Sequence, residues 1–267
     1  MSVLSAPRAQ PLAGRAPAID APRRAIVGVP VAALTHDQAL ALIERAFEQK
    51  RHLRLAYCNA HLANLAATDP ALRAVLAGFL ILPDGIGVDI ASRLLHGAPF
   101  PANLNGTDFT PALLRARREP LRVMLLGGKP GVAERAAARL RAEHPRHDFA
   151  VLGHGYFPAQ DEPALLARLE EARPDLLLVA FGNPRQEQWI TGKLDARHCS
   201  VAAGIGAFFD FLAGEVARAP RWIRRLRLEW LYRLWLEPGR LWRRYVVGNP
   251  IFLLRVLRQR LTGRNPA

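Results

Sequence analysis

The chain has little cysteine and no long uncharged apolar run, and these two absences exclude several classes of protein. Cys58 and Cys199 are its two cysteines and they lack C-x-x-C spacing, so the sequence predicts neither a disulfide framework nor a zinc site. We interpret both as small buried hydrophobic residues in a reducing compartment. No stretch of eighteen or more uncharged apolar residues occurs, which argues against a membrane-spanning helix.

Motifs for metals and for common nucleotides are also missing. No D-x-D pair and no spaced cluster of His, Asp and Glu suits a divalent cation, so we expect neither a metal nor a cofactor. Residues 127–131 (GGKPG) match neither G-x-G-x-x-G nor G-x-x-x-x-G-K-[ST], which argues against an ordinary nucleoside triphosphatase. Their place between a buried strand and a helix makes Gly127, Gly128 and Lys129 candidate phosphate ligands, with a tight glycine turn as the alternative.

The first 24 residues are rich in Ala, Pro and Arg and contain no continuous apolar segment. This composition is typical of a disordered leader and not of a secretory signal. Half of the 267 residues are hydrophobic, so the rest of the chain is long enough to bury a substantial core. We expect a leader over 1–24, an α/β domain over 25–215, an appendage over 216–267, and a cytoplasmic location.

Arginine is abundant near the C-terminus. Residues 216–267 contain thirteen arginines and only two acids, so this segment carries most of the formal net charge of +14. Four of the five tryptophans lie among these arginines. Basic and aromatic side chains that alternate in this way suit the boundary between water and an anionic lipid surface. The alternative is an amphipathic helix whose tryptophans, Trp230 and Trp235 among them, pack on the body.

Strand-like and helix-like segments alternate along the rest of the chain. Short apolar runs predict strands, and periodic segments such as the one that follows the capping sequence Thr35-His-Asp-Gln38 predict helices. This alternation indicates an α/β, Rossmann-like fold, with a mainly parallel sheet and helices on both faces. The predicted strands are 26–30, 53–57, 79–82, 121–126, 149–152, 176–181 and 201–203.

Polar residues follow most of these strands. In parallel sheets, ligands gather at the carboxyl ends of the strands. Five clusters in corresponding places predict a ligand site there, although each alone reads as a turn: Asn59; Asp84; Gly127, Gly128 and Lys129; His154; and Asn183 through Gln186 to Glu187.

Asp84 is the strongest catalytic candidate. It lies between Pro83 and Gly85 at a strand end, which would fix its carboxylate as a general base requires. The alternative is that Asp84 caps the helix that begins near Ile86. Asp89 is expected to face solvent or a neighbouring arginine. The turn over 103–108 precedes another helix, with Asp108 as its expected cap. Asn105, Thr107 and Asp108 are candidate substrate contacts.

These motifs together resemble the WecG/TagA/CpsF family of bacterial glycosyltransferases. The resemblance runs in order from about residue 26 to 254, and it is carried by the segments LPDGIGV (82–88), GNPRQE (182–187), GIGAFFD (204–210), RAPRW (218–222), LEWLYR (228–233) and YVVGNP (245–250).

The resemblance implies metal-independent, inverting transfer of a sugar from a UDP-sugar to a polyprenyl-diphosphate-linked sugar. The same resemblance places the reaction at the cytoplasmic face of the inner membrane. The expected partners are therefore the UDP-sugar donor, the lipid-linked acceptor and the anionic membrane surface. By the same resemblance Asp84 is the base, Asn59 and Gln186 contact substrate, and appendage arginines complete the site over the diphosphate. The arginines that correspond are Arg221, Arg224 and Arg233.

Two departures from the family pattern bear on the donor sugar. Tyr57 stands where many members have threonine two residues before the asparagine, and the turn over 103–108 lacks the basic residue of the mannosaminyl-transferring branch. The sequence therefore resembles more closely the branch that transfers glucose in exopolysaccharide synthesis. Transfer of N-acetylmannosamine or its uronic acid is the alternative.

Two functions of other classes compete with this interpretation. A pI near 11 with interleaved aromatics also suits a nucleic-acid-binding protein. However, apolar stretches such as 246–254 would serve no purpose on DNA, so we expect no nucleic-acid partner. A Rossmann dehydrogenase is the other competitor, and its glycine pattern fits this chain badly.

Overall fold

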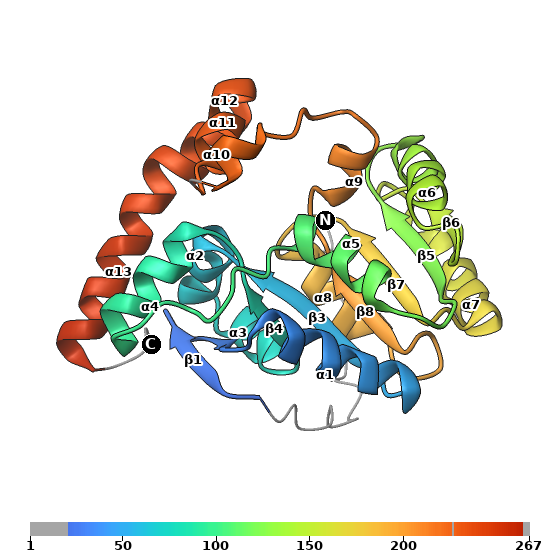
Figure 1. The fold of residues 1–267 in the computed structure, drawn as a ribbon, viewed down its shortest axis with the longest axis horizontal. Coiled ribbons are helices and arrows are strands. Elements are labelled where there is room, and N and C mark those ends of the chain that lie inside the picture. The colour runs from blue at the N-terminus through green and yellow to red at the C-terminus, as the bar shows by residue number, and fades with distance from the viewer. Residues whose placement is uncertain (1–20, 226, 264–267) are drawn as a thin grey trace, which may run out of the picture.

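The computed structural model describes residues 21–225 and 227–263. Its centre is a six-stranded parallel sheet in the order β4-β3-β8-β7-β5-β6, with helices on both faces (Figure 1). The predicted Rossmann-like α/β fold is thereby confirmed. The strands are β3 (Leu53–Cys58), β4 (Leu80–Pro83), β5 (Arg122–Gly127), β6 (Asp148–Gly153), β7 (Leu176–Ala180) and β8 (Val201–Gly204).

The first predicted strand, 26–30, is wrong. The chain instead forms an antiparallel hairpin of β1 (Arg23–Ile26) and β2 (Val29–Ala32), which turns at Val27 and Gly28. Positive φ angles at both turn residues match the twist of a tight hairpin. The leader boundary also shifts, because Arg24 lies within β1 and its Nη1 donates to Ser92 Oγ over 2.7 Å. Residues 1–20 of the predicted leader lie outside the described residues.

Helix starts follow from local chemistry. The Thr35 side chain accepts from Gln38 N while the Gln38 side chain accepts from Thr35 N, so the predicted capping box is present. The Asp69 carboxylate caps α3, with Pro70 at its first position. The helices of the body are α1 (His36–Glu48), α2 (Ala60–Thr68), α3 (Pro70–Ala77), α4 (Ile86–His96), α5 (Gly106–Ala116), α6 (Val132–Glu143), α7 (Glu162–Ala172), α8 (Arg185–Lys193) and α9 (Phe208–Leu212).

Alternate residues of the strands fill two cores on opposite faces of the sheet. On β3, Ala56 and Cys58 join the core that also contains side chains of α2, α3, α4 and α8. Leu55 and Tyr57 join the other core, with side chains of α1, α5, α6 and α9. A parallel sheet buried on both faces explains why its strands read as continuous apolar runs in the sequence.

The C-terminal appendage is helical and is docked on the body. It comprises α10 (Arg221–Arg225), α11 (Glu229–Leu236), α12 (Pro238–Trp242), a π-helical turn η2 (Arg243–Val247) and α13 (Gly248–Thr262). In Figure 1, α13 runs beside α4 and α2, and α10 to α12 lie beyond its N-terminal end. Phe252 and Val256 of α13 belong to the core shared with α2 and α4, and Asn64 Nδ2 donates to Gly248 O over 2.7 Å.

The outer face of the appendage carries exposed aromatic side chains. Trp222 is 63 % exposed and Trp235 is 75 % exposed, and Trp242 is also on the surface. The alternative interpretation, in which Trp235 packs on the body, is therefore wrong. Trp230 is partly buried, and its ring contacts that of Tyr245 at a tilt of 59°, with 5.8 Å between the centroids. Within residues 21–225 and 227–263, no helix combines the length and apolarity that crossing a bilayer requires.

Candidate active site

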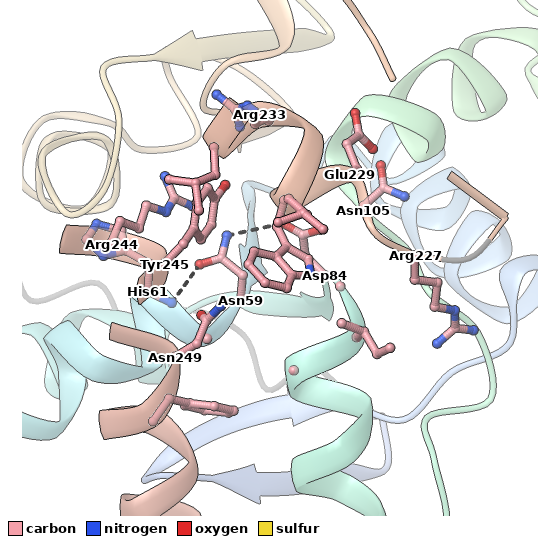
Figure 2. Close-up of a pocket in the computed structure, with 18 of the residues that line it drawn as sticks. Asn59, His61, Asp84, Asn105, Arg227, Glu229, Arg233, Arg244, Tyr245 and Asn249 are labelled. Atoms are coloured by element: carbon pink, nitrogen blue, oxygen red, sulfur yellow. Dashed lines mark hydrogen bonds between the residues drawn. The ribbon is translucent and has the colours of Figure 1, made fainter. Parts of the chain in front are cut away.

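A pocket of about 710 Å³ lies between the carboxyl ends of β3 and β4 and the helices of the appendage. Both parts of the chain contribute polar side chains to it, as Figure 2 shows. The polar and charged residues that line it are Asn59, His61, Asp84, Asn103, Asn105, Thr107, Asp108, Arg224, Arg227, Glu229, Arg233, Arg244, Tyr245 and Asn249.

Strand register brings Asn59 and Asp84 together. β3 and β4 are parallel neighbours in which Cys58 pairs with Pro83, so the residues that follow these two are adjacent. Asn59 Oδ1 caps α2 by accepting from His61 N and Leu62 N, each over 3.1 Å. This fixes the amide so that its Nδ2 donates to Asp84 Oδ2 over 3.2 Å. Capping thus orients the group that holds the carboxylate.

Asp84 is held at the floor of the pocket. Its backbone N–H donates to Cys58 O over 2.8 Å, and the next N–H, that of Gly85, donates to Asn103 Oδ1 over 2.9 Å. Gly85 is the N-cap of α4 and no side chain caps this helix, so the alternative role of Asp84 as a cap is wrong. Burial raises the pKa of Asp84, against the lowering effects of Asn59, Arg244 and Arg233.

The turn before α5 lines the same pocket through Asn105, Thr107 and Asp108. The expectation that Asp108 caps the helix is wrong, because Asn105 does so by accepting from Asp108 N over 3.0 Å. The Asp108 carboxylate instead pairs with Arg218 and, at 3.5 Å, with Arg224. Burial alone would raise the pKa of Asp108, but the hydrogen bond from Asn105 and the charge of Arg218 lower it.

Two arginines named in the sequence analysis reach the pocket. Arg224 does so while paired with Asp108, and Arg233 does so with its guanidinium 5.2 Å from the centre of the Phe211 ring. Arg233 Nη2 lies 3.9 Å from Glu237 Oε2. Arg221 begins α10, but its side chain lies outside the described part of the structure.

Sequence reasoning missed Arg244. Its side chain lines the pocket, and no described carboxylate lies within ion-pair distance of it. Burial lowers the pKa of Arg244. It lies in the π-helical turn η2, which directs Arg244, Tyr245 and Val246 to one pocket. The signal available in the sequence was its position just before the YVVGNP segment.

His61 is a second pocket residue to which sequence reasoning gave no role. Burial and, secondarily, the charge of Arg244 lower its pKa to about 4. The imidazole is therefore neutral at physiological pH, and it offers one hydrogen-bond donor and one acceptor to the pocket.

Asp89 and Arg227 join the appendage to α4. Asp89 is buried, accepts from Phe100 N over 3.2 Å and forms an ion pair with Arg227. The expected arginine partner is present, and the expected exposure to solvent is wrong. A buried carboxylate that loses its ion-pair partner is costly, so this contact holds the appendage against α4.

The predicted glycine-rich phosphate site does not line the pocket. Gly127 ends β5 and Gly128 follows it, and β5 is separated from β3 by β7 and β8. A Cβ atom on Gly127 would lie 2.5 Å from Ala180 O, and one on Gly128 would lie 2.9 Å from Val132 Cγ1. Close packing thus accounts for both glycines, as the turn alternative expects, and Lys129 stands beside them and not at Asp84.

The cluster after β7 is also outside the pocket lining. Gln186 Oε1 accepts from Gly182 N and Gly206 N, each over 3.2 Å. Asn183 Nδ2 and Gln186 Nε2 donate to Glu187 Oε1 over 2.6 and 2.8 Å. Gln186 and Glu187 are buried. In this geometry, Gln186 ties the loops after β7 and β8 together, and it makes no contact with the volume beside Asp84.

The described residues contain no group of three or more His, Cys, Asp or Glu side chains arranged to hold a metal ion. Within the pocket, the groups able to bind a diphosphate are the guanidinium groups of Arg233 and Arg244, together with hydrogen-bond donors such as Tyr245 and Asn249.

Comparison with known proteins identifies the family of the chain. The chain is 37 % identical over 180 residues to the N-acetylglucosaminyldiphosphoundecaprenol N-acetyl-beta-D-mannosaminyltransferase of Bacillus subtilis (strain 168), which covers 67 % of this chain and 68 % of the relative. It is 33 % identical over 221 residues to the protein of the same name from Bacillus spizizenii, covering 82 % and 84 %. Residues 24–266 match the model of the family described as glycosyl transferase WecG/TagA/CpsF. The chain therefore belongs to the WecG/TagA/CpsF family of glycosyltransferases.

Proposed function

We propose that this protein is an inverting glycosyltransferase that moves a sugar from a UDP-sugar to N-acetylglucosamine linked to a polyprenyl diphosphate. The names of the two relatives from Bacillus support the acceptor. The observation that carries the proposal is a partly buried carboxylate, Asp84, in one pocket with Arg233 and Arg244 of the appendage. A base beside cations is what transfer from a nucleotide diphosphate requires.

N-acetylmannosamine is the donor sugar that we propose. The departures at Tyr57 and at residues 103–108 led to glucose as the expected donor, but both relatives are named mannosaminyltransferases. Tyr57 is buried under α5, where its ring would lie 2.9 Å from a Cβ atom on Gly106, and it does not line the pocket. Its identity therefore supports no particular donor.

In the proposed mechanism, Asp84 takes the proton from the acceptor hydroxyl as that oxygen attacks the anomeric carbon. The raised pKa of Asp84 makes its carboxylate a stronger base than an exposed aspartate. Asn59 holds the carboxylate in place through the 3.2 Å hydrogen bond. The bond between the anomeric carbon and the diphosphate oxygen breaks on the opposite face, which inverts the configuration.

The charge that develops on the departing UDP is neutralised, in this proposal, by Arg244 and Arg233. Arg224 and Arg227 also line the pocket, but Asp108 and Asp89 already pair with them. Arg233 lies at 3.9 Å from Glu237, so Arg244 is the arginine of the pocket with no carboxylate partner among the described residues. Preorganised cations in a partly buried site stabilise such a charge without reorganisation. We propose that these guanidinium groups take the place of a metal ion, so that turnover persists in the presence of a chelator.

The appendage is proposed to dock on the cytoplasmic face of the inner membrane. Exposed tryptophans among arginines suit an anionic lipid surface, and the appendage also exposes the apolar pocket residues Leu231 and Leu253. Family membership favours lipid-linked sugar over nucleic acid as the phosphate-bearing partner.

Replacing Asp84 with Asn tests the proposal. We expect turnover to fall about 10²- to 10⁴-fold, the contribution of a positioned base. Thermal stability should hold or rise, because burial disfavours the charged carboxylate in the folded protein. The assay offers UDP-N-acetylmannosamine, UDP-glucose and UDP-N-acetylglucosamine, each with the polyprenyl-diphosphate acceptor. Turnover of the Asp84→Asn variant within about threefold of wild type would exclude the base, and transfer from none of the donors would exclude the function.

A further inference from the structure

Glu229 is a carboxylate in the pocket that forms no ion pair with any described residue. It lies in the first turn of α11 and lines the pocket. Its Oε1 is buried and has no hydrogen-bond partner, and no described cation lies within 4.0 Å of the carboxylate. Leaving a buried charged acceptor without a partner costs stability. Such a group in a pocket therefore requires an explanation.

The surroundings of Glu229 decide which kind of ligand fits it. Burial raises its pKa, the nearby charges of Arg218 and Arg233 oppose this effect, and those of Asp108 and Asp84 add to it. Arg218 is itself paired with Asp108. An anionic group placed here would meet three carboxylates. A neutral group with O–H or N–H donors would supply the hydrogen bond that Glu229 lacks.

The two sides of the pocket differ in the charges that are left unpaired. Figure 2 shows Arg244 and Tyr245 on one side of the Asn59–Asp84 pair, and Glu229 with Asn105 on the other. Arg227 also lies on the side of Glu229, but it is paired with Asp89. The cations of the first side suit a diphosphate. The carboxylate and amide of the second side suit the hydroxyl and amide groups of a sugar ring, with Asp84 between the two sides.

We propose that Glu229 binds a sugar beside Asp84, by accepting a hydrogen bond from a hydroxyl or amide N–H of the ring, and so contributes to sugar specificity. This inference rests on the proposed function. The donor sugar and the acceptor sugar both present such groups, and the experiment below distinguishes them.

A purely structural role is the competing explanation. A carboxylate in the first turn of a helix interacts favourably with the helix dipole, typically by 0.3–1 kcal/mol, and α11 has no side-chain cap. That role would lower thermal stability in a Glu229→Gln variant and would affect all substrates equally. A sugar contact would instead appear as a coupling between Glu229 and one substituent of one sugar.

The test is a cycle of enzyme variants and deoxy substrates. kcat/KM is measured for wild type and Glu229→Gln with monodeoxy analogues of the donor sugar and, separately, of the acceptor sugar. We expect one analogue to lose about tenfold to a hundredfold with wild type and to lose no more than about twofold with Glu229→Gln. A coupled donor analogue assigns the contact to the donor sugar, and a coupled acceptor analogue assigns it to the acceptor.

If every deoxy analogue lowers kcat/KM by the same factor in wild type and in Glu229→Gln, the proposal is overturned, whatever the stability of the variant. Glu134→Gln is the matched control, since Glu134 is exposed on α6 and its substitution makes the same chemical change outside the pocket. The activity of wild type distinguishes failure of the Glu229 contact from failure of the proposed function. If wild type transfers sugar and the cycle shows no coupling, the role of Glu229 fails alone. If wild type transfers none, the proposed function fails with it.

Discussion

Asn59 holds Asp84 with one end of its side-chain amide and caps helix α2 with the other. Nδ2 donates to Asp84 Oδ2 over 3.2 Å, and Oδ1 accepts from the N–H groups of His61 and Leu62. The hydrogen bond to Asp84 lowers the pKa of that carboxyl, which burial raises. A helix terminus therefore sets both the position and the basicity of the proposed base.

Replacing Asn59 with Ser separates these two functions. Serine retains an N-cap oxygen but offers no amide N–H to Asp84. We expect the pKa of Asp84 to rise further, so that the acidic limb of the kcat/KM profile moves to higher pH and activity below that limb falls about tenfold. Asn59→Ala should show the same shift and also lose about 1 kcal/mol of stability with the cap. A pH profile of Asn59→Ser that superimposes on wild type would contradict the role.

Replacing Arg244 with Gln tests its proposed contact with the departing diphosphate. Loss of one preorganised donor to a developing charge typically lowers kcat about 10²- to 10³-fold. Since the charge of Arg244 also lowers the pKa of His61, that pKa should rise from about 4 in an NMR titration of the variant. Arg258→Gln is the control, because it removes one arginine charge from the exposed face of α13. This variant should retain activity. Equal losses in both variants would indicate a general charge effect.

The sequence predicted the floor of the site well, because strand ends obey simple rules. Asn59 and Asp84 each follow an apolar run, and parallel pairing of β3 with β4 makes them neighbours. The same rule failed for Gly127 and Gln186. Strand order, which decides how far these ends lie from β3, depends on crossover connections that local patterns do not reveal.

The roof of the site was predicted only in part. Basic and aromatic composition identified the appendage, and Arg224 and Arg233 do reach the pocket. Arg244 was missed because the π-helical turn η2 breaks the 3.6-residue period on which a prediction of helix faces depends. Asp108 was taken for a cap, while Asn105, three residues earlier, has the geometry of one.

Membrane docking is best tested with point substitutions. Deleting residues from 216 onward would remove Phe252 and Val256, which belong to the core of the body, so that truncation would unfold more than the appendage. The double variant Trp222→Ala/Trp235→Ala removes two exposed side chains. Full burial of one apolar side chain contributes about 1.5–3 kcal/mol, and tryptophan at a membrane interface is buried only in part. We therefore expect the double substitution to weaken binding to anionic vesicles about tenfold to a hundredfold, with thermal stability unchanged.

Tyr156→Ala supplies the control for that measurement. Tyr156 is an exposed aromatic residue that follows β6, far along the chain from the appendage. Its loss should leave vesicle binding as it is in wild type. Binding by the tryptophan variant that equals wild type, at low and at physiological salt, would contradict docking through this face.

Glu187 should make the stability of the fold depend on pH near neutrality. Burial raises its pKa from 4.5 to about 7, although Gln186 and Asn183 donate to it. A raised pKa in the folded state means that the stabilising contribution is fully present below 4.5 and is lost as pH rises through about 7. The difference corresponds to about 3 kcal/mol at most. Urea denaturation at pH 5 and pH 8 should therefore show a larger fall in the free energy of unfolding for wild type than for Glu187→Gln.

The comparison of wild type with Glu187→Gln isolates the contribution of Glu187. Burial also raises the pKa values of Asp84, Asp210 and Glu229, so these groups lower the free energy of unfolding of both proteins as pH rises. Glu134→Gln, on the exposed face of α6, should retain the full wild-type decline. If Glu187→Gln declines as steeply as wild type, the carboxyl is ionised throughout this range. Gln186, which ties the loops after β7 and β8 together, would then donate to an ionised Glu187 carboxylate and not to a neutral carboxyl.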